Sequence, residues 1–191
     1  MSKLSILIAD DEALIRLDLK EMLESAGYVV CGEANDGLKA VELAKKLLPD
    51  LVILDVKMPG LDGLEVAKIM QTMNIPVVLL TAYNKPNFIN RAEKISVYGY
   101  LVKPITERNL LPALQIAYAR WKEMQSVQQE LKGTQIKLEN QKIIGRARAL
   151  IAQRKNISEY EAHQQLVHEA MQLGITLVDR ATQIIEVNFA K

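Results

Sequence analysis

Four short apolar runs of this sequence each end in polar side chains that could take part in phosphate chemistry. The four run ends carry the acidic cluster Asp10-Asp11-Glu12, then Asp55, Thr81 and Lys103. In an open parallel sheet the carboxyl ends of the strands meet at one edge, where ligands bind. We therefore expect these side chains to share one site.

Carboxylates gathered at one edge repel one another, so a divalent cation with a preference for oxygen ligands is expected, and Mg²⁺ fits. With Mg²⁺ and Lys103 offsetting charge, Asp55 can act as a carboxylate nucleophile and form an aspartyl phosphate. The Thr81 hydroxyl can donate to a phosphate oxygen. Taken singly, Asp10 could cap a helix, Thr81 could be an ordinary strand residue, and Lys103 could be a solvated surface group.

Alternating strand and helix patterns surround these residues. Strands are predicted at Leu4–Ala9, Tyr28–Glu33, Leu51–Asp55, Pro76–Leu80 and Gly99–Val102. Helices are predicted at Glu12–Ala26, Asp36–Leu48, Gly60–Met73 (a turn and then a helix) and Pro86–Ile95. Five strands that alternate with helices indicate an α/β fold with a parallel sheet covered on both faces.

The motifs at the run ends resemble the receiver domain of two-component response regulators. They are Ile8-Ala9-Asp10-Asp11-Glu12, Asp55-Val56-Lys57-Met58-Pro59-Gly60-Leu61-Asp62-Gly63, Thr81-Ala82 and Tyr100-Leu101-Val102-Lys103-Pro104. The likeness covers about residues 3–120. It implies a flavodoxin-like sheet of order 2-1-3-4-5 and phosphorylation by a sensor histidine kinase. The first domain is assigned to residues 1–120.

The same resemblance implies a role for individual residues. Asp11 and Asp55 would bind Mg²⁺ directly, Asp10 would help through water, and the backbone carbonyl of Lys57 would be a further ligand. The Lys103–Pro104 bond is expected to be cis. Thr81 and Tyr100 match the family's switch pair, in which Thr81 moves toward the phosphate and Tyr100 packs inward.

From Thr106 onward the pattern is wholly helical, with Thr106 as the expected N-cap. Apolar residues at heptad d positions are Leu110, Ala117, Met124, Leu131 and Leu138, and the a positions hold Leu114, Trp121, Gln128, Gln135 and Lys142. This spacing predicts a coiled coil, assigned as a linker over residues 121–141 that continues the last receiver helix. A solvated single helix is the alternative.

Three helices are predicted in residues 142–191. The first is Lys142–Gln153, the second begins at a capping box from Ser158 to Glu161, and the third begins at a similar cap, Thr176 to Asp179. Lys142–Ile185 is similar to the ANTAR domain, a three-helix RNA-binding module. The likeness rests on Lys142-Ile143-Ile144, Ala147-Arg148-Ala149-Leu150, Ile157-Ser158-Glu159, Glu161-Ala162, Leu166, Ala170-Met171, Ala181 and Ile184-Ile185.

The ANTAR resemblance implies a transcription antiterminator of the ethanolamine-utilisation type, in which a dimer binds paired RNA hairpins in a leader transcript. Candidate RNA contacts are Arg146, Arg148, Arg154, Lys155, Tyr160, His163, His168 and Arg180. RNA loops are bound through stacking, base contacts and basic side chains. A tail that binds DNA or a protein partner is the alternative.

Composition narrows the remaining function classes. The net charge of +1 gives no global bias toward nucleic acid or membrane. The single cysteine, Cys31, rules out an internal disulfide and fits an inert structural thiol in a reducing cytoplasm. Neither a signal peptide nor a membrane span is expected, so we predict a cytoplasmic protein. The tail contains no nucleophile–base pair or metal cluster, so we expect a regulatory protein rather than an enzyme.

Overall fold

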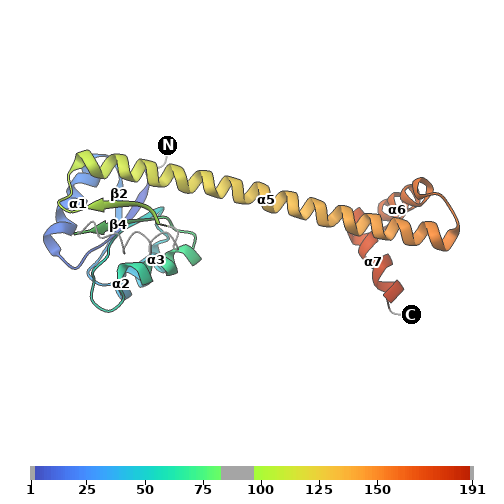
Figure 1. Cartoon of the computed structure of the whole chain (residues 1–191), viewed down its shortest axis with the longest axis horizontal. Helices are drawn as coiled ribbons and strands as arrows, with labels where there is room; N and C mark the ends of the chain where they lie inside the picture. The colour runs from blue at the N-terminus through green and yellow to red at the C-terminus, as the bar shows by residue number, and fades with distance from the viewer. Residues whose placement is uncertain (1–2, 83–96, 190–191) are drawn as a thin grey trace. The chain divides into compact units, whose positions relative to one another are not determined.

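A five-stranded parallel sheet is the centre of the first of two units, Met1–Gln125 and Ser126–Lys191 (Figure 1). The computed structural model describes residues 3–82 and 97–189. The strands are β1 (Ser5–Ala9), β2 (Val29–Ala34), β3 (Leu51–Asp55), β4 (Val77–Thr81) and β5 (Val97–Val102). All four neighbouring pairs are parallel, and the order is β2-β1-β3-β4-β5, which confirms the predicted topology.

Helices α2 (Gly37–Leu47) and α3 (Gly63–Thr72) lie on one face of this sheet (Figure 1). Ala40, Ala44 and Met70 from these helices pack against alternate strand residues such as Leu7 and Leu54. Cys31 packs against the same core, and burial raises the pKa of its thiol, which keeps the thiol protonated near neutral pH.

Helices α1 (Ala13–Ser25) and the first part of α5 (Glu107–Lys155) pack on the other face. Side chains of successive strand residues point to opposite faces, so Ile8 and Ile53 meet this second layer while their neighbours meet the first. Leu19 of α1 and Leu110 of α5 are fully buried there. The helix predicted at Pro86–Ile95 lies outside the described residues.

Local capping sets where the helices that flank the sheet edge begin. The Asp36 side chain accepts a hydrogen bond from the Lys39 backbone N–H at the start of α2. Asp62 and Glu65 form a capping box at the start of α3, each bonding the other's backbone N–H. The Asp36 cap fixes the connection that follows β2. The capping box of Asp62 and Glu65 fixes the connection that follows β3, which is the segment directly after Asp55.

Helix α5 corrects part of the heptad assignment. Leu110, Leu114 and Ala117 are buried in the core of the first unit because they face the sheet, so they are unavailable to a second chain. Further along, Met124 and Leu131 are 49% and 61% exposed. The predicted coiled-coil seam can therefore start only after the helix leaves the sheet.

The second unit contains the end of α5, α6 (Glu159–Leu173) and α7 (Leu177–Phe189). The helix predicted at Lys142–Gln153 is the last part of α5, which is unbroken from Glu107 to Lys155. A small core joins the three helices, and its buried members are Ala147, Ile151, Ala162, Leu166 and Ala181.

Both predicted caps in the second unit are present. Ser158 and Glu161 form a capping box at the start of α6, and Thr176 and Asp179 make the equivalent bonds at the start of α7. Gly174 ends α6 in the left-handed region, with φ at 65°. Within residues 3–82 and 97–189, the structure holds no helix with the length and hydropathy that crossing a membrane requires.

Candidate functional site

Asp55 is the last residue of β3, the central strand of the sheet. Every residue of β3 is buried, and Asp55 is only 5% exposed. Strand register places Ala9 of β1 beside Leu54 on one side, and Leu80 of β4 beside Asp55 on the other. Asp10, which follows β1, therefore lies at the same edge of the sheet and is fully buried.

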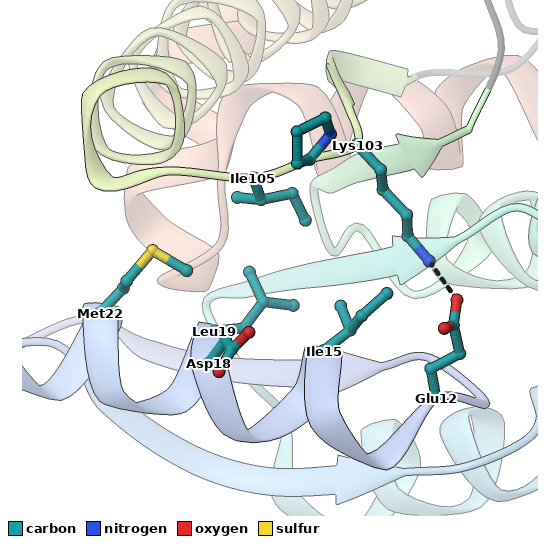
Figure 2. A pocket seen from close by; sticks show the side chains of 8 residues that line it. Glu12, Ile15, Asp18, Leu19, Met22, Lys103 and Ile105 are labelled. Carbon is teal, nitrogen blue, oxygen red and sulfur yellow. Dashed lines mark ion pairs between the residues drawn. The ribbon is translucent and has the colours of Figure 1, made fainter.

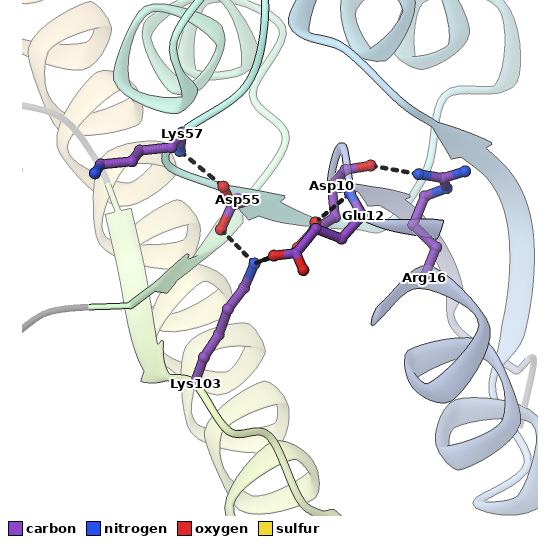
Figure 3. Close-up of polar contacts among 6 residues, drawn as sticks. All are labelled: Asp10, Glu12, Arg16, Asp55, Lys57 and Lys103. Carbon is purple, nitrogen blue, oxygen red and sulfur yellow. Dashed lines mark hydrogen bonds and ion pairs between the residues drawn. The ribbon is translucent and has the colours of Figure 1, made fainter. Parts of the chain in front are cut away.

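Lys103 joins the two buried carboxylates (Figure 3). Its Nζ lies 2.8 Å from Asp10 Oδ2 and 2.9 Å from Asp55 Oδ1. Glu12 Oε1 lies 3.5 Å from the same ammonium and is more exposed. Acidic residues from two strand ends, Asp10 with Glu12 and Asp55, thus meet around the Lys103 ammonium from a third.

Backbone groups hold the other sides of this cluster. The Lys57 N–H donates to Asp55 Oδ2 at 2.8 Å, and the Glu12 N–H donates to Asp10 Oδ1 at 2.9 Å. The Lys103 N–H donates to the Thr81 carbonyl at 2.9 Å, which fixes β5 beside β4 at its end. The Lys103–Pro104 peptide bond is cis, as the sequence predicted.

Burial and charge act against each other at this site. Burial raises the pKa of Asp55 above its usual value, and the neighbouring Asp10 adds to this, although Lys103 opposes it. Burial acts to lower the pKa of Lys103, but hydrogen bonds and charges from Asp10 and Asp55 outweigh it and the pKa of Lys103 is raised. Lys103 therefore stays charged, and its single positive charge lies between the two buried carboxylates of Asp10 and Asp55.

Asp11 and Glu12 complete an acidic group with Asp10. Carboxylate oxygens of the three residues lie within 4.8 Å of one another. A cluster of carboxylate oxygens beside a buried aspartate has the donor chemistry that Mg²⁺ prefers. The residues at this edge therefore fit a hard divalent cation.

Arg16 is a residue of this site that the sequence reasoning missed. Its Nη1 donates to the Asp10 backbone carbonyl at 2.7 Å from the first turns of α1 (Figure 3). The bond ties the acidic segment to the helix and brings a second positive charge close to it. Its spacing four residues after Glu12, on the helix that follows the acids, is the signal that could have indicated it.

A pocket of about 430 Å³ opens beside the cluster, between α1 and the segment after β5 (Figure 2). Apolar side chains from both sides line it, and Glu12 and Lys103 lie at one end (Figure 2). Its apolar members are Ile15, Leu19, Met22, Pro104 and Ile105. The pocket thus connects an apolar surface to the charged cluster.

In the second unit, two of the eight candidate RNA contacts are held in internal ion pairs. Arg148 Nη2 lies 2.8 Å from Glu159 Oε2. Arg180 donates from both Nε and Nη2 to Glu169 Oε2, at 2.9 and 2.6 Å. Both pairs link different helices, so these arginines brace the three-helix unit.

The other six candidates are less enclosed. Arg146, Arg154, Lys155, Tyr160 and His168 are exposed, and His163 is half-buried. The His163 Nδ1 is buried without a hydrogen-bond partner among the described residues. His163 and His168 lie on different sides of α6, as expected from their spacing.

Comparisons with known proteins agree with both halves of this description. Residues 6–115 match the family described as "Response regulator receiver domain", and residues 132–185 match the "ANTAR domain". The chain is 40% identical over 182 residues to the transcriptional regulatory protein PdtaR of Mycobacterium tuberculosis, covering 95% of this chain and 89% of that protein. The chain belongs to the response regulators with an ANTAR domain.

Other relatives match the receiver part alone. Sporulation initiation phosphotransferase F of Bacillus subtilis is 40% identical over 101 residues, which cover 52% of this chain and 81% of that protein. The solved receiver domain of the response regulator NarL from Mycobacterium tuberculosis superposes with a TM-score of 0.59 at 33% identity, covering 62% of this chain and 98% of that one.

In this response regulator, the two residues expected to form the switch pair lie on neighbouring strands. Thr81 ends β4 one residue after the partner of Asp55, so it is placed at the edge that carries the cluster. Tyr100 lies on β5, opposite Leu79, and half of its side chain is exposed. The structure thus shows Tyr100 in an outward position.

Proposed function

We propose that this response regulator accepts a phosphoryl group on Asp55 from a sensor histidine kinase and, once phosphorylated, binds hairpins in leader RNA as a transcription antiterminator. The observation that carries the proposal is the Lys103 ammonium held between two buried carboxylates, in a chain whose other unit is an ANTAR domain. Its role is regulatory, with Asp55 as the phosphoacceptor rather than part of an enzyme that turns over a substrate.

The transfer forms one bond and breaks another. An oxygen of the Asp55 carboxylate attacks the phosphorus of a phosphohistidine, the new P–O bond forms as the P–N bond breaks, and the imidazole leaves and takes up a proton. Phosphoryl transfer depends mainly on positioning and on neutralising charge. Lys103 supplies positive charge, Thr81 supplies a hydroxyl, and the Lys57 N–H orients Asp55.

Asp10, Asp11, Asp55 and the Lys57 carbonyl would hold Mg²⁺ at this edge. The ion would neutralise negative charge on the phosphoryl oxygens during transfer. Support comes from the clustered carboxylate oxygens of Asp10, Asp11 and Glu12 and from the burial of Asp55, which raises its pKa although Lys103 lies beside it. Arg16 would keep the acidic segment in place through the Asp10 carbonyl.

The phosphodonor would dock over α1. Leu14 and Leu17 on this helix are 76% and 51% exposed, and Ile15 and Leu19 of the same helix line a pocket that ends at Glu12 and Lys103. An apolar surface near Lys103, which contacts the acceptor, suits a protein donor, because docking there would bring its phosphohistidine toward Asp55. A donor helix packed on these leucines would exclude water from the reacting groups.

The charge distribution of the second unit supports RNA as its partner. From residue 142 to residue 180 every acidic side chain is engaged within the unit, and these are Glu159, Glu161, Glu169 and Asp179. Lys142, Arg146 and Lys155 form no ion pair with a residue that the structure describes. Between residues 142 and 180 the charges without an ion pair among the described residues are therefore positive, which favours a partner with a phosphate backbone, while Glu186 on α7 lies outside this stretch.

Activation would act through pairing of two copies along α5. Met124, Val127, Leu131 and Leu138 form a stripe at spacings of three, four and seven residues and are 47–61% exposed in the single chain. Such a stripe is covered when a second α5 packs beside it. A dimer would bring two ANTAR domains to paired hairpins, and the bound RNA would be kept from folding into a terminator. We expect this to take place in the cytoplasm, where both transcription and the catalytic part of the kinase are found.

The test is selection of bound RNAs from a pool of leader transcripts, with the full chain unphosphorylated and phosphorylated. We expect enrichment of hairpins that depends on phosphorylation and is lost in Asp55→Ala, which should also take up no phosphoryl group. The binding should weaken steeply with salt. Enrichment of duplex DNA with palindromic half-sites, or no nucleic-acid binding in either state, would overturn the proposal in favour of a DNA or protein partner.

A further inference from the structure

One side of α6 is exposed and points away from the core of its unit. Tyr160, Gln164 and His168 follow one another at four-residue spacing, so they line up along the helix, and Met171 lies next to them. Tyr160 and Met171 are 72% and 76% exposed. We refer to these four residues as the α6 ridge. The opposite side of the helix is filled by the buried Ala162, Leu166 and Ala170.

The polar members of the ridge are held in place but keep free hydrogen-bonding groups. Gln164 Nε2 donates to the Tyr160 hydroxyl at 2.8 Å, and Gln172 Nε2 donates to His168 Nε2 at 2.9 Å. Neither the Gln164 carbonyl nor His168 Nδ1 has a partner among the residues that the structure describes. An amide and an imidazole with open positions can donate to and accept from the edge of a nucleobase.

The ridge is uncharged although its helix is acidic in composition. All three carboxylates of α6 are engaged elsewhere: Glu159 with Arg148, Glu161 with Ser158, and Glu169 with Arg180. Lys142, Arg146 and Lys155 form no ion pair with a residue that the structure describes, and all three lie on α5 rather than on α6. The unit thus carries basic side chains on α5 and, on α6, an uncharged strip with an exposed aromatic ring.

We propose that the α6 ridge binds the unpaired bases of an RNA loop. The Tyr160 ring stacks on one base, Gln164 and His168 bond base edges, and Lys142, Arg146 and Lys155 neutralise the phosphates. The inference rests on the proposed function, namely that this unit binds RNA, and adds which surface reads the loop. It also assigns Arg148 and Arg180 to holding the helices together rather than to RNA.

The experiment measures binding of the full chain, phosphorylated on Asp55, to two fluorescent probes: RNA hairpins with a randomised loop, and a blunt RNA duplex of the same length. Tyr160→Ala should weaken hairpin binding by about 5- to 150-fold, the effect of losing one base stack, while duplex binding and the salt dependence stay as in the wild type. Gln164→Ala should reduce the preference for hairpin over duplex. Tyr160→Phe, which keeps the ring, should retain most of the affinity.

Two controls separate the ridge from general effects. Gln129→Ala removes an exposed glutamine of α5 that lies outside the three-helix core and at neither an a nor a d position of the heptad, so it should change nothing. Lys155→Ala should weaken hairpin and duplex binding alike and lower the salt slope by about one. Helical circular dichroism of each variant verifies that the unit still folds, which is expected because Tyr160 and Gln164 are exposed.

The outcomes distinguish this inference from the proposed function. If the wild type binds hairpins and both Tyr160→Ala and Gln164→Ala bind them equally well, the ridge assignment is wrong while RNA binding stands. If the wild type binds neither probe, both proposals fail. A change of oligomeric state in Tyr160→Ala with unchanged RNA affinity would also overturn the assignment, because the ridge would then contact a second copy.

Discussion

Gly63 tests whether the backbone around Asp55 is as closely packed as the structure indicates. It is the first residue of α3, and its N–H bonds the Val56 carbonyl at 2.9 Å. A Cβ placed on Gly63 would lie 2.3 Å from the Asp55 carbonyl oxygen and 2.8 Å from the Val56 Cα. Carbon and oxygen atoms normally stay about 3.3 Å apart, so Gly63→Ala requires a backbone shift of roughly 1 Å.

Because the obstructing atoms are backbone, no side-chain rotation can relieve the clash. We expect Gly63→Ala to cost the upper end of the overpacking range, about 3 kcal/mol in the free energy of unfolding of the first unit. That is a large part of a stability of about 5–15 kcal/mol. Since the shift also displaces Asp55, the rate of phosphoryl uptake should fall by about 100-fold.

Urea unfolding followed by the fluorescence of Trp121, the only tryptophan, measures the first unit. With a urea slope of about 2 kcal/mol/M, the midpoint should fall by about 1.5 M. Gly99→Ala is the matched control, because its Cβ would meet Ala117 and Val78 at ordinary distances of 3.5 and 3.6 Å. An unfolding midpoint and a phosphorylation rate in Gly63→Ala equal to those of Gly99→Ala would refute the reasoning.

Three further predictions concern the charges and the apolar stripe. Lys103→Ala leaves Asp10 and Asp55 buried without their partner. It should lower the free energy of unfolding of the first unit by about 3 kcal/mol, and by less when Mg²⁺ is added. Urea titrations with and without the ion measure both effects. Hydrogen bonds from Gln165 and Arg180 hold the pKa of Glu169 below its usual value of about 4.5, so its stabilisation of the second unit should be complete above that pH and lost as the pH falls through the lowered value. Thermal melts of Glu169→Gln at several pH values should show a weaker acid dependence than the wild type, and an equal dependence would contradict this. Leu131→Glu should prevent self-association of the phosphorylated chain while Ile136→Glu, at a similarly exposed position off the stripe, should not, as light scattering can decide.

The parallel sheet could be predicted because local patterns agree with the tertiary fold, and its strand order was implied by the resemblance to receiver domains. Strand β3 is a continuous apolar run that ends in an acid, and it is buried on both faces in the structure. Two helix starts were also predicted, because Ser158 with Glu161 and Thr176 with Asp179 form caps from residues three apart. These features depend on neighbours along the chain.

The heptad in α5 shows where sequence spacing alone is insufficient. The same three- and four-residue apolar spacing is produced by a helix packed on a sheet and by a coiled-coil seam. Leu110 and Ala117 belong to the first case, because they are fully buried against the sheet, whereas Leu131 is exposed. The spacing does not say where one use ends and the other begins.

Sequence alone determined the set of residues at the strand ends, the parallel sheet that brings them together, and the helical character of everything after Thr106. The reason is that strand ends, helix caps and apolar periodicity are encoded within a few residues of one another. Only the tertiary structure decided that Lys103 lies between Asp10 and Asp55, that Arg16 holds the Asp10 carbonyl, and that Arg148 and Arg180 are occupied by Glu159 and Glu169. Those pairings depend on which side chains meet across different elements, and long flexible side chains choose their partners only when the elements have packed.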